Sequence, residues 1–362
     1  MRGLLRQDIR PSPAATSHLD GCLGCRACEW VCPAGVPYGE LIDETRAAVP
    51  LDRQRSLPIR LLARAIRTVI GADPRWIRLM DRLARRIGRI IPHSGHHLAR
   101  PGSPRIRYAN VPWAAAVLDP LSTYRGDVGL FLGCIARMTD QNTLHDSITA
   151  LRRYGYRVHV PAGQGCCGAL HWHEGDRRGA IRLARRNIAA FRDSRIGQVV
   201  STASACSTML REYGRHFADE ADAVRFADRS IDITELLARE KPIALQPVVL
   251  RIAVHQPCTM RSACSRPDAT GTLLRQLPGI SLIPLPIDTG CCGAGGAHQL
   301  LRGAEAKAIR ETTLDAIRTI DPDLVVTTNV GCAMHLHAGL ANANSRCDVR
   351  HPVSLIAEQS AS

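Results

Sequence analysis

Four cysteines near the N-terminus are spaced so that they can hold one inorganic cluster. Cys22, Cys25, Cys28 and Cys32 form a C-x2-C-x2-C-x3-C run, and Pro33 follows it. This spacing is typical of 4Fe-4S ligands, because short loops let successive thiolates point inward at one cube. Zinc is the alternative, but its ligands usually come as separated pairs. We therefore predict that this run binds an iron–sulfur cluster.

The fourth cysteine of the run raises a question of pairing. In proteins with two such runs, the fourth cysteine of one run binds the cluster of the other. This sequence contains a single run. Two arrangements stay open: Cys32 closes its own cluster in a rearranged loop, or a first run is missing from this sequence.

Eight further cysteines form two groups with nearly the same internal spacing. In the first group, 31 residues separate the first cysteine from a Cys-Cys-Gly triplet, and 38 separate that triplet's second cysteine from the last. In the second group the two gaps are 32 and 39 residues. The first group is Cys134, Cys166, Cys167 and Cys206; the second is Cys258, Cys291, Cys292 and Cys332. Gaps that match within one residue indicate an internal duplication.

The adjacent cysteines of each group favour metal binding over disulfides. Vicinal disulfides are strained, and disulfides are rare in reducing compartments. The first residues show no secretory signal, so we expect a cytoplasmic protein. Four thiolates suit an iron–sulfur cluster or zinc. We predict one further iron–sulfur or metal centre in each copy, with zinc as an open alternative in one of them.

Strands and helices alternate within each copy. The first copy predicts strands over 127–134, 156–162 and 198–206, with helices through 144–151 and 180–191. The second predicts strands over 250–258, 281–285 and 324–332, with helices near 273 and through 314–317. Such alternation indicates parallel α/β units, whose ligands gather beyond the carboxyl ends of the strands. The first and last cysteine of each group lie at such ends, so each copy can bring its thiolates together.

The cysteine pattern divides the chain into four parts. Residues 1–45 carry the first run, 46–125 are basic and free of cysteine, and 126–245 and 246–362 are the two copies. Within the basic region, IRLLARAIRTVIG and PRWIRLMDRLARRIGRII carry apolar residues at helical spacing, which predicts two amphipathic helices. We expect their apolar faces to pack on the body of the protein, with contact to a membrane surface or a partner as the alternative.

Charge and aromatic content bear on the class of partner. The net charge is +14 at pH 7, and a basic surface can meet nucleic acid, an anionic membrane or an acidic protein. Aromatic residues make up only 4% of the chain, so stacking platforms for bases are scarce. We predict no nucleic-acid partner. No apolar stretch approaches the roughly 20 residues that cross a bilayer.

Several other residues stand close to the cysteine groups. His335 follows Cys332 by three residues. Two interpretations are open: it binds or supports the metal centre of the second copy, or it is a packed surface histidine. We expect His255, His171 and His173 to make local hydrogen bonds.

Two cysteines and two glycines complete the set. Cys264 and Cys347 fall outside the repeat and are expected to be buried as small apolar residues. Gly168 and Gly293 are expected to adopt positive φ or to allow close backbone approach.

From about residue 20 onward, the chain resembles the iron–sulfur subunit of glycolate oxidase. GCLGCRACEWVCPAGVPYGELID is similar to its second ferredoxin run. GQGCCGALHWH, STASACSTMLREYG, CTMRSAC, TGCCGAGGAH and TTNVGCAMHL are similar to the blocks of its CCG (cysteine-rich) domains, in the same order. The lactate-utilisation subunit, the anaerobic glycerol-3-phosphate dehydrogenase iron–sulfur subunit and the B subunit of heterodisulfide reductase are related proteins.

The resemblance implies an α/β protein with a ferredoxin-type cluster segment, a helical linker and two tandem CCG domains. It implies an electron-transfer subunit with no catalytic residues of its own. FAD-binding partner subunits would oxidise a 2-hydroxy acid, such as glycolate to glyoxylate, and the chain would pass electrons toward quinone, in the cytoplasm or at the inner face of the membrane. The resemblance also implies metal ligation by the four cysteines of the first run and by the CCG cysteines of both copies.

The sequence departs from these relatives at two points. The family carries two ferredoxin runs and this sequence one, while its opening RGLLRQ resembles the segment after the first run; we therefore expect a start site further upstream. Met209 and His335 stand where heterodisulfide reductase has a further cysteine in each copy. Thiol–disulfide chemistry of that type is therefore disfavoured. The lactate-utilisation and glycerol-3-phosphate systems stay open as alternatives to glycolate oxidation.

Overall fold

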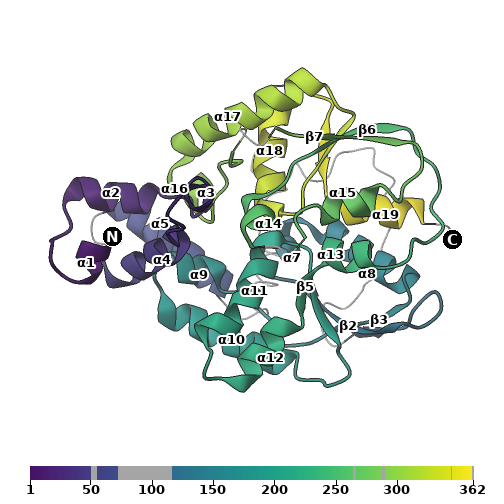
Figure 1. Ribbon diagram of the computed structural model, residues 1–362, viewed down its shortest axis with the longest axis horizontal. Helices are drawn as coiled ribbons and strands as arrows, with labels where there is room; N and C mark the ends of the chain where they lie inside the picture. The colour runs from purple at the N-terminus through teal and green to yellow at the C-terminus, as the bar shows by residue number, and fades with distance from the viewer. Residues whose placement is uncertain (50–54, 72–115, 264–265, 287–289, 344, 361–362) are drawn as a thin grey trace, which may run out of the picture.

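The computed structural model describes residues 1–49, 55–71, 116–263, 266–286, 290–343 and 345–360 (Figure 1). The second helix predicted for the basic region, within residues 74–91, and Cys264 lie outside the described residues. The first predicted helix of that region is present as α5 (Leu57–Gly71).

The first copy is built on a five-stranded sheet with strand order β1-β3-β2-β4-β5. All neighbours are parallel except β1, which runs antiparallel to β3. The central strand β2 is buried along nearly its whole length, as expected for a strand covered by helices on both faces. The strands are β1 (Ala116–Leu118), β2 (Gly126–Phe131), β3 (Tyr156–Val160), β4 (Gln198–Ser201) and β5 (Ser230–Asp232).

Helices connect these strands and cover the sheet. Asp140 caps the first long helix by accepting a hydrogen bond from the Thr143 amide, and the helix buries Leu144, Ile148 and Leu151 as the sequence predicts. The helices of this copy are α7 (Ile135–Thr139), α8 (Gln141–Arg153), α9 (Ala169–His173), α10 (Arg177–Ala190), α11 (Ser204–His216), α12 (Ala221–Asp228) and α13 (Ile233–Arg239).

The second copy repeats the arrangement with a four-stranded, fully parallel sheet in the order β7-β6-β8-β9. This is the order of β3, β2, β4 and β5 in the first copy, so the α/β fold and the duplication predicted from cysteine spacing are confirmed. The strands are β6 (Leu250–Val254), β7 (Ile280–Pro284), β8 (Leu324–Val326) and β9 (Asp348–Arg350). The helices are α14 (Cys258–Ala263), α15 (Ala269–Leu274), α16 (His298–Leu301), α17 (Gly303–Ile320), α18 (Val330–Asn342) and α19 (Pro352–Gln359).

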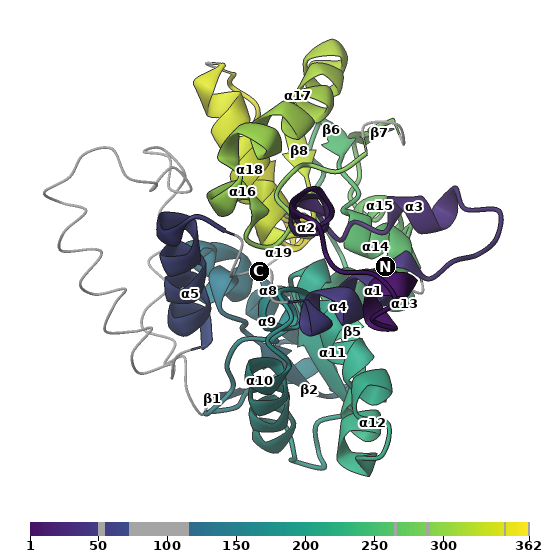
Figure 2. The same ribbon diagram turned by 90° about the vertical axis from the view of Figure 1, so that its left-hand side faces the viewer.

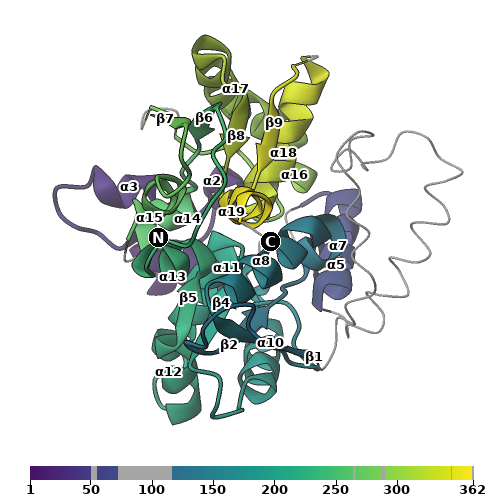
Figure 3. The same cartoon turned by 90° about the vertical axis from the view of Figure 1, so that its right-hand side faces the viewer.

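The two copies share one hydrophobic core. Leu144 and Leu151 of the first copy belong to the same buried cluster as Leu273 and Ile356 of the second. The last helix, α19, packs on α8 of the first copy, and α13 packs on α15 (Figure 3). The copies are therefore held in a defined mutual orientation.

The predicted strands extend too far toward the last cysteine of each group. β4 ends at Ser201 and β8 at Val326, so Cys206 and Cys332 lie in the first turns of α11 and α18 and not at strand ends. In α18 the cause is local, because the Asn329 side chain accepts a hydrogen bond from the Gly331 amide and starts the helix. Both cysteines still lie at the edge of the sheet where ligands were expected.

The N-terminal segment lies against both copies (Figures 1 and 2). It contains α1 (Arg2–Leu5), α2 (Pro13–Gly21), α3 (Ala27–Trp30) and α4 (Tyr38–Ala48) around a small core. The amphipathic helix α5 buries Ala63 and turns Ile66 and Ile70 toward a cavity described below. Leu62, expected on the packed face, is exposed, so the prediction that this face packs on the protein holds only in part. Among the described residues, no helix is long and apolar enough to span a bilayer.

Candidate metal centres

The structure brings together the four predicted cysteines of the first copy. Cys134 directly precedes α7, the Cys166–Cys167 pair precedes α9, and Cys206 lies in the first turn of α11. The Cys134 and Cys166 sulfurs are 3.4 Å apart. Hydrogen bonds from Cys166 and Cys206 lower the pKa of the Cys167 thiol well below its usual value. The group can therefore present thiolate sulfur at one point.

Hydrogen bonds from surrounding side chains hold this Cys-Cys-Gly loop in place. The Asn187 side chain accepts from the Gly165 amide at 2.9 Å and donates to the Cys166 carbonyl at 2.8 Å. The Tyr213 hydroxyl donates to the Cys167 carbonyl at 2.6 Å. Asn187 and Tyr213 are fully buried, so the loop is clamped by groups that have no access to water.

The four predicted cysteines of the second copy also meet. Cys292 and Cys332 are buried with their sulfurs 2.7 Å apart, while Cys258 and Cys291 are half-buried. Hydrogen bonds from Cys258 and Cys292 lower the pKa of the Cys291 thiol to about 3. The second group therefore has a deep pair of sulfurs and an outer pair.

The glycines of the two loops are required by their backbone geometry, as predicted. Gly168 has φ +87° and Gly293 has φ +79°, a region that suits residues without a side chain. A Cβ atom at Gly293 would lie 2.4 Å from the Ala306 carbonyl oxygen of α17, and at Gly168 it would lie 3.4 Å from the Ala180 carbonyl oxygen. Each loop is thus pressed against the backbone of the helix behind it.

His335 supports the second loop from behind. His335 is buried, and its Nε2 lies 3.1 Å from the Ala306 carbonyl oxygen. The Arg310 guanidinium donates a hydrogen bond to the backbone carbonyl of His335 at 3.0 Å. It is therefore neither a surface histidine nor a member of the sulfur group.

His255 lies at the second group of thiols, a position that sequence reasoning missed. Its Nδ1 lies 3.0 Å from Thr327 Oγ1, so the predicted hydrogen bond is present but is not local, because it joins residues 72 apart in the chain. A ring nitrogen of His255 and the sulfurs of Cys292 and Cys332 all lie within 4.8 Å of one another. Burial lowers the pKa of His255 to about 4, so the ring is neutral at pH 7. The available sequence signal was the H-x-x-C spacing to Cys258.

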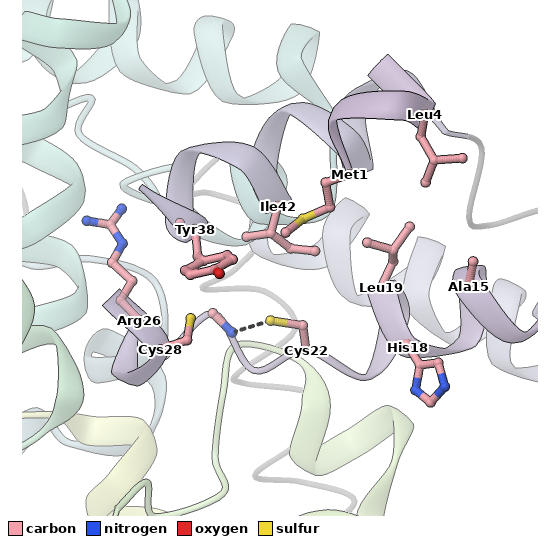
Figure 4. A pocket seen from close by; sticks show the side chains of 12 residues that line it. Met1, Leu4, Ala15, His18, Leu19, Cys22, Arg26, Cys28, Tyr38 and Ile42 are labelled. Atoms are coloured by element: carbon pink, nitrogen blue, oxygen red, sulfur yellow. Dashed lines mark hydrogen bonds between the residues drawn. The ribbon is translucent and has the colours of Figure 1, made fainter. Parts of the chain in front are cut away.

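The first cysteine run lies between α2 and α4 and contains the short helix α3, which carries Cys28. Figure 4 shows Cys22 and Cys28 beside Tyr38 and Ile42 of α4. These side chains line a cavity of about 280 Å³. Gly24 and Arg26 both have positive φ, so the chain turns tightly within the run.

Cys32 has different surroundings from the other three members of the run. Hydrogen bonds from the backbone of Val36 and Ala34 lower the pKa of the half-buried Cys32 thiol. Cys32 lines neither the 280 Å³ cavity nor the larger cavity described next. By contrast, Cys25 is partly buried, which raises the pKa of its thiol, and it lines the same larger cavity as Cys291 of the second copy.

A larger cavity, which we name the central cavity, connects the three cysteine groups. It has a volume of about 370 Å³ and a mostly apolar lining that includes Ile66, Ile70 and Phe131. All eight cysteines of the two copies line it, together with Cys22 and Cys25. The donor sets therefore open onto a common space with a mostly apolar lining.

Specific contacts fix the first run over this cavity. The Arg46 guanidinium donates to the carbonyl oxygens of Leu19 and Cys22, and to that of His173 in the first copy. Arg26 pairs with Glu212 at 2.7 Å, also in the first copy.

The second copy makes its own contacts with the run. Ser262 donates to the Cys25 carbonyl at 3.4 Å, and Leu23 lies against Gly295. The Arg261 guanidinium stacks over the Trp30 ring at 4.8 Å from its centre. The run is therefore attached to both copies.

The donor chemistry fits iron–sulfur clusters. Each copy offers four converging sulfurs, and soft thiolate ligands select iron–sulfur clusters, zinc or copper(I). The burial of five of these eight cysteines and the clamped loops would protect such a group from solvent.

This fold and this donor set define a protein with two tandem cysteine-rich domains. Residues 128–211 and 252–337 match the CCG cysteine-rich domain family. The chain is 30% identical to the glycolate oxidase iron–sulfur subunit of Escherichia coli over 94% of this chain and 81% of that protein. It therefore belongs to the family of glycolate oxidase iron–sulfur subunits.

Two further relatives mark the range of the similarity. A probable glycolate oxidase iron–sulfur subunit of Bacillus subtilis is 25% identical over 97% of this chain and 84% of that protein. Lactate utilization protein A of Bacillus velezensis is 27% identical over 62% of this chain and 96% of its own length.

Proposed function

We propose that this chain is the electron-transfer subunit of a flavin-dependent 2-hydroxy-acid dehydrogenase, with glycolate as the substrate of its partners. FAD-binding subunits would oxidise glycolate to glyoxylate, and this chain would carry the electrons toward quinone at the membrane. Its family membership and the names of its relatives support this role.

The observation that carries the proposal is the central cavity, onto which all three cysteine groups open. Iron–sulfur clusters bound there would accept and release single electrons. The chain's own residues supply the thiolate ligands, an apolar lining that keeps water away, and the buried Asn187 and Tyr213 that orient one of the loops. We assign the ligands to Cys22, Cys25, Cys28, Cys32, Cys134, Cys166, Cys167, Cys206, Cys258, Cys291, Cys292 and Cys332.

The contacts of the first run favour an order of electron transfer. Cys25 and Cys291 both line the central cavity, and the Cys25 carbonyl accepts a hydrogen bond from Ser262 of the second copy. We infer that the second copy exchanges electrons with the first run, and that the first copy is reached across the central cavity. A zinc ion in one copy would interrupt this route, so metal analysis is part of the test.

The test uses the full chain purified without air from cells that also produce its partners. We expect bound iron and acid-labile sulfide, signals in electron paramagnetic resonance after reduction by dithionite, and a flavoprotein that co-purifies. Addition of glycolate should reduce the clusters without dithionite. Protein without iron would contradict the cluster assignment, and clusters that glycolate cannot reduce would contradict the choice of substrate.

Lactate serves as the comparison substrate in the same experiment, because a lactate utilization protein is among the relatives. Faster cluster reduction by lactate than by glycolate would reassign the substrate and leave the electron-transfer role intact.

A further inference from the structure

We propose that His255 is a metal ligand, so that the second copy holds its iron–sulfur centre through nitrogen as well as sulfur. This inference rests on the proposed function, because it assumes that the second copy binds iron. The first copy, in contrast, would bind through thiolates alone.

The position of the ring carries the argument. A ring nitrogen of His255 and the Cys292 and Cys332 sulfurs lie within 4.8 Å of one another, close enough to share one metal atom. Only 4% of His255 is exposed. The imidazole is therefore part of the inner, deep side of the donor set.

The hydrogen bond on the other side of the ring fits a ligand. Metal-binding histidines almost always use their second ring nitrogen in a hydrogen bond that fixes the ring. Here Nδ1 is bonded to Thr327 Oγ1 at 3.0 Å. Nε2 makes no hydrogen bond to any described residue, which leaves it as the nitrogen available to a metal.

The backbone at His255 is fixed by a hydrogen bond to the neighbouring strand. The His255 amide donates to the Val326 carbonyl at 2.9 Å, which extends the pairing of β6 and β8 by one residue. A side chain fixed at the end of a strand needs little further ordering to bind.

The first copy offers an internal comparison at the same register. Phe131 precedes Cys134 by three residues, as His255 precedes Cys258. Phe131 is buried in the apolar cluster around Cys166 and Cys167 and contributes no donor atom. With His255, the second copy offers five donor side chains where the first offers four.

The nitrogen ligand would tune the centre. A neutral imidazole in place of an anionic thiolate stabilises the reduced cluster and raises its reduction potential, as in clusters that carry two histidine ligands. Because its reduction potential would be higher, such a centre would draw electrons from the first run, whose Cys25 lines the same cavity.

The experiment is pulsed electron paramagnetic resonance of the dithionite-reduced full chain, with and without ¹⁵N-labelled histidine. We expect one strongly coupled nitrogen that changes with the label. Cys332→Ser should remove this signal, which assigns it to the second copy. His255→Cys should retain the iron and lose the nitrogen coupling, and the reduction potential of that centre should fall.

Two controls guard against indirect effects. His298 also lines the central cavity, so His298→Gln should leave the nitrogen coupling unchanged. His255→Phe copies the first copy's residue and should also abolish the coupling.

Three results would overturn the assignment of His255: no strongly coupled nitrogen in the wild-type protein, a coupling that survives in His255→Cys, or zinc in the second copy. Protein that binds no iron at all would instead contradict the proposed function.

Discussion

The two copies have the same strand order and the same four cysteines, but different chemistry around them. In the first copy, three of the four cysteines are buried and the loop is clamped by Asn187 and Tyr213. In the second, two cysteines are only half-buried, His255 joins the sulfurs, and His335 supports the loop. The duplicated topology therefore fixes where the sulfurs meet, while the surrounding side chains determine how each site differs.

The largest effects are expected from removing one sulfur in each copy. Cys167→Ser and Cys292→Ser should each abolish the centre of its own copy and leave the other intact. Loss of a structural metal should cost about 5 kcal/mol or more of folding free energy, because metal binding is coupled to folding. Iron analysis and resonance spectra of the two variants check this. If either substitution removes both centres, the copies do not bind metal independently.

A buried polar residue on the helix behind each loop, Asn187 on α10 and Thr313 on α17, sharpens the comparison of the two loops. Asn187→Ala should destabilise the protein by about 3 kcal/mol, because it leaves the Gly165 amide and the Cys166 carbonyl without their buried partner. Thr313 is also fully buried, but its hydroxyl has no hydrogen-bond partner among the described residues. Thr313→Val should therefore change stability by less than about 1 kcal/mol. Urea unfolding measures both, and equal losses would contradict the contrast.

The helix caps that follow the last strand of each sheet predict opposite responses to pH. Asp232 caps α13 and His351 caps α19, each through a backbone amide two residues on. Burial raises the pKa of Asp232 to about 6, so its folded form keeps a proton that the unfolded chain releases above about pH 4. This site loses stability as pH rises through that window. Burial lowers the pKa of His351 to about 3 in the folded protein. The unfolded chain binds a proton at this histidine below about pH 6.5, while the folded protein does not, so this site loses stability as pH falls.

Asn substitutions keep a capping acceptor and remove the titration at each site. Between about pH 4 and 6, the free energy of unfolding of Asp232→Asn should rise relative to wild type as pH rises, by about 2 kcal/mol. That of His351→Asn should fall relative to wild type over the same range, also by about 2 kcal/mol. Denaturant midpoints across that range provide the measurement. Parallel slopes in the two variants would show that the caps do not titrate as their burial requires.

The smallest effect is expected where the first run touches the second copy. Trp30→Ala removes the stacking on Arg261 and should weaken this attachment by about 1 kcal/mol. Hydrogen exchange of the amides around Cys25 should accelerate, while amides of the first copy stay unchanged. Trp30→Phe, which retains an aromatic ring, should lie between Trp30→Ala and wild type.

The sequence by itself determined the duplication, the alternation of strands and helices, and the need for glycine at 168 and 293. These features are local or periodic, because they depend on cysteine spacing, apolar pattern and backbone conformation. The end of β8 was placed too late because the capping interaction of Asn329 starts α18 before Cys332.

Only the tertiary structure decided which groups meet across the chain. His255 is oriented by Thr327, 72 residues away, and Cys25 lines the same cavity as Cys291. No spacing rule contains these contacts, because they depend on how two sheets and an N-terminal segment pack around a shared cavity. Cys32 lines neither of the two cavities that the other three cysteines of its run border, although the sequence spacing alone groups all four.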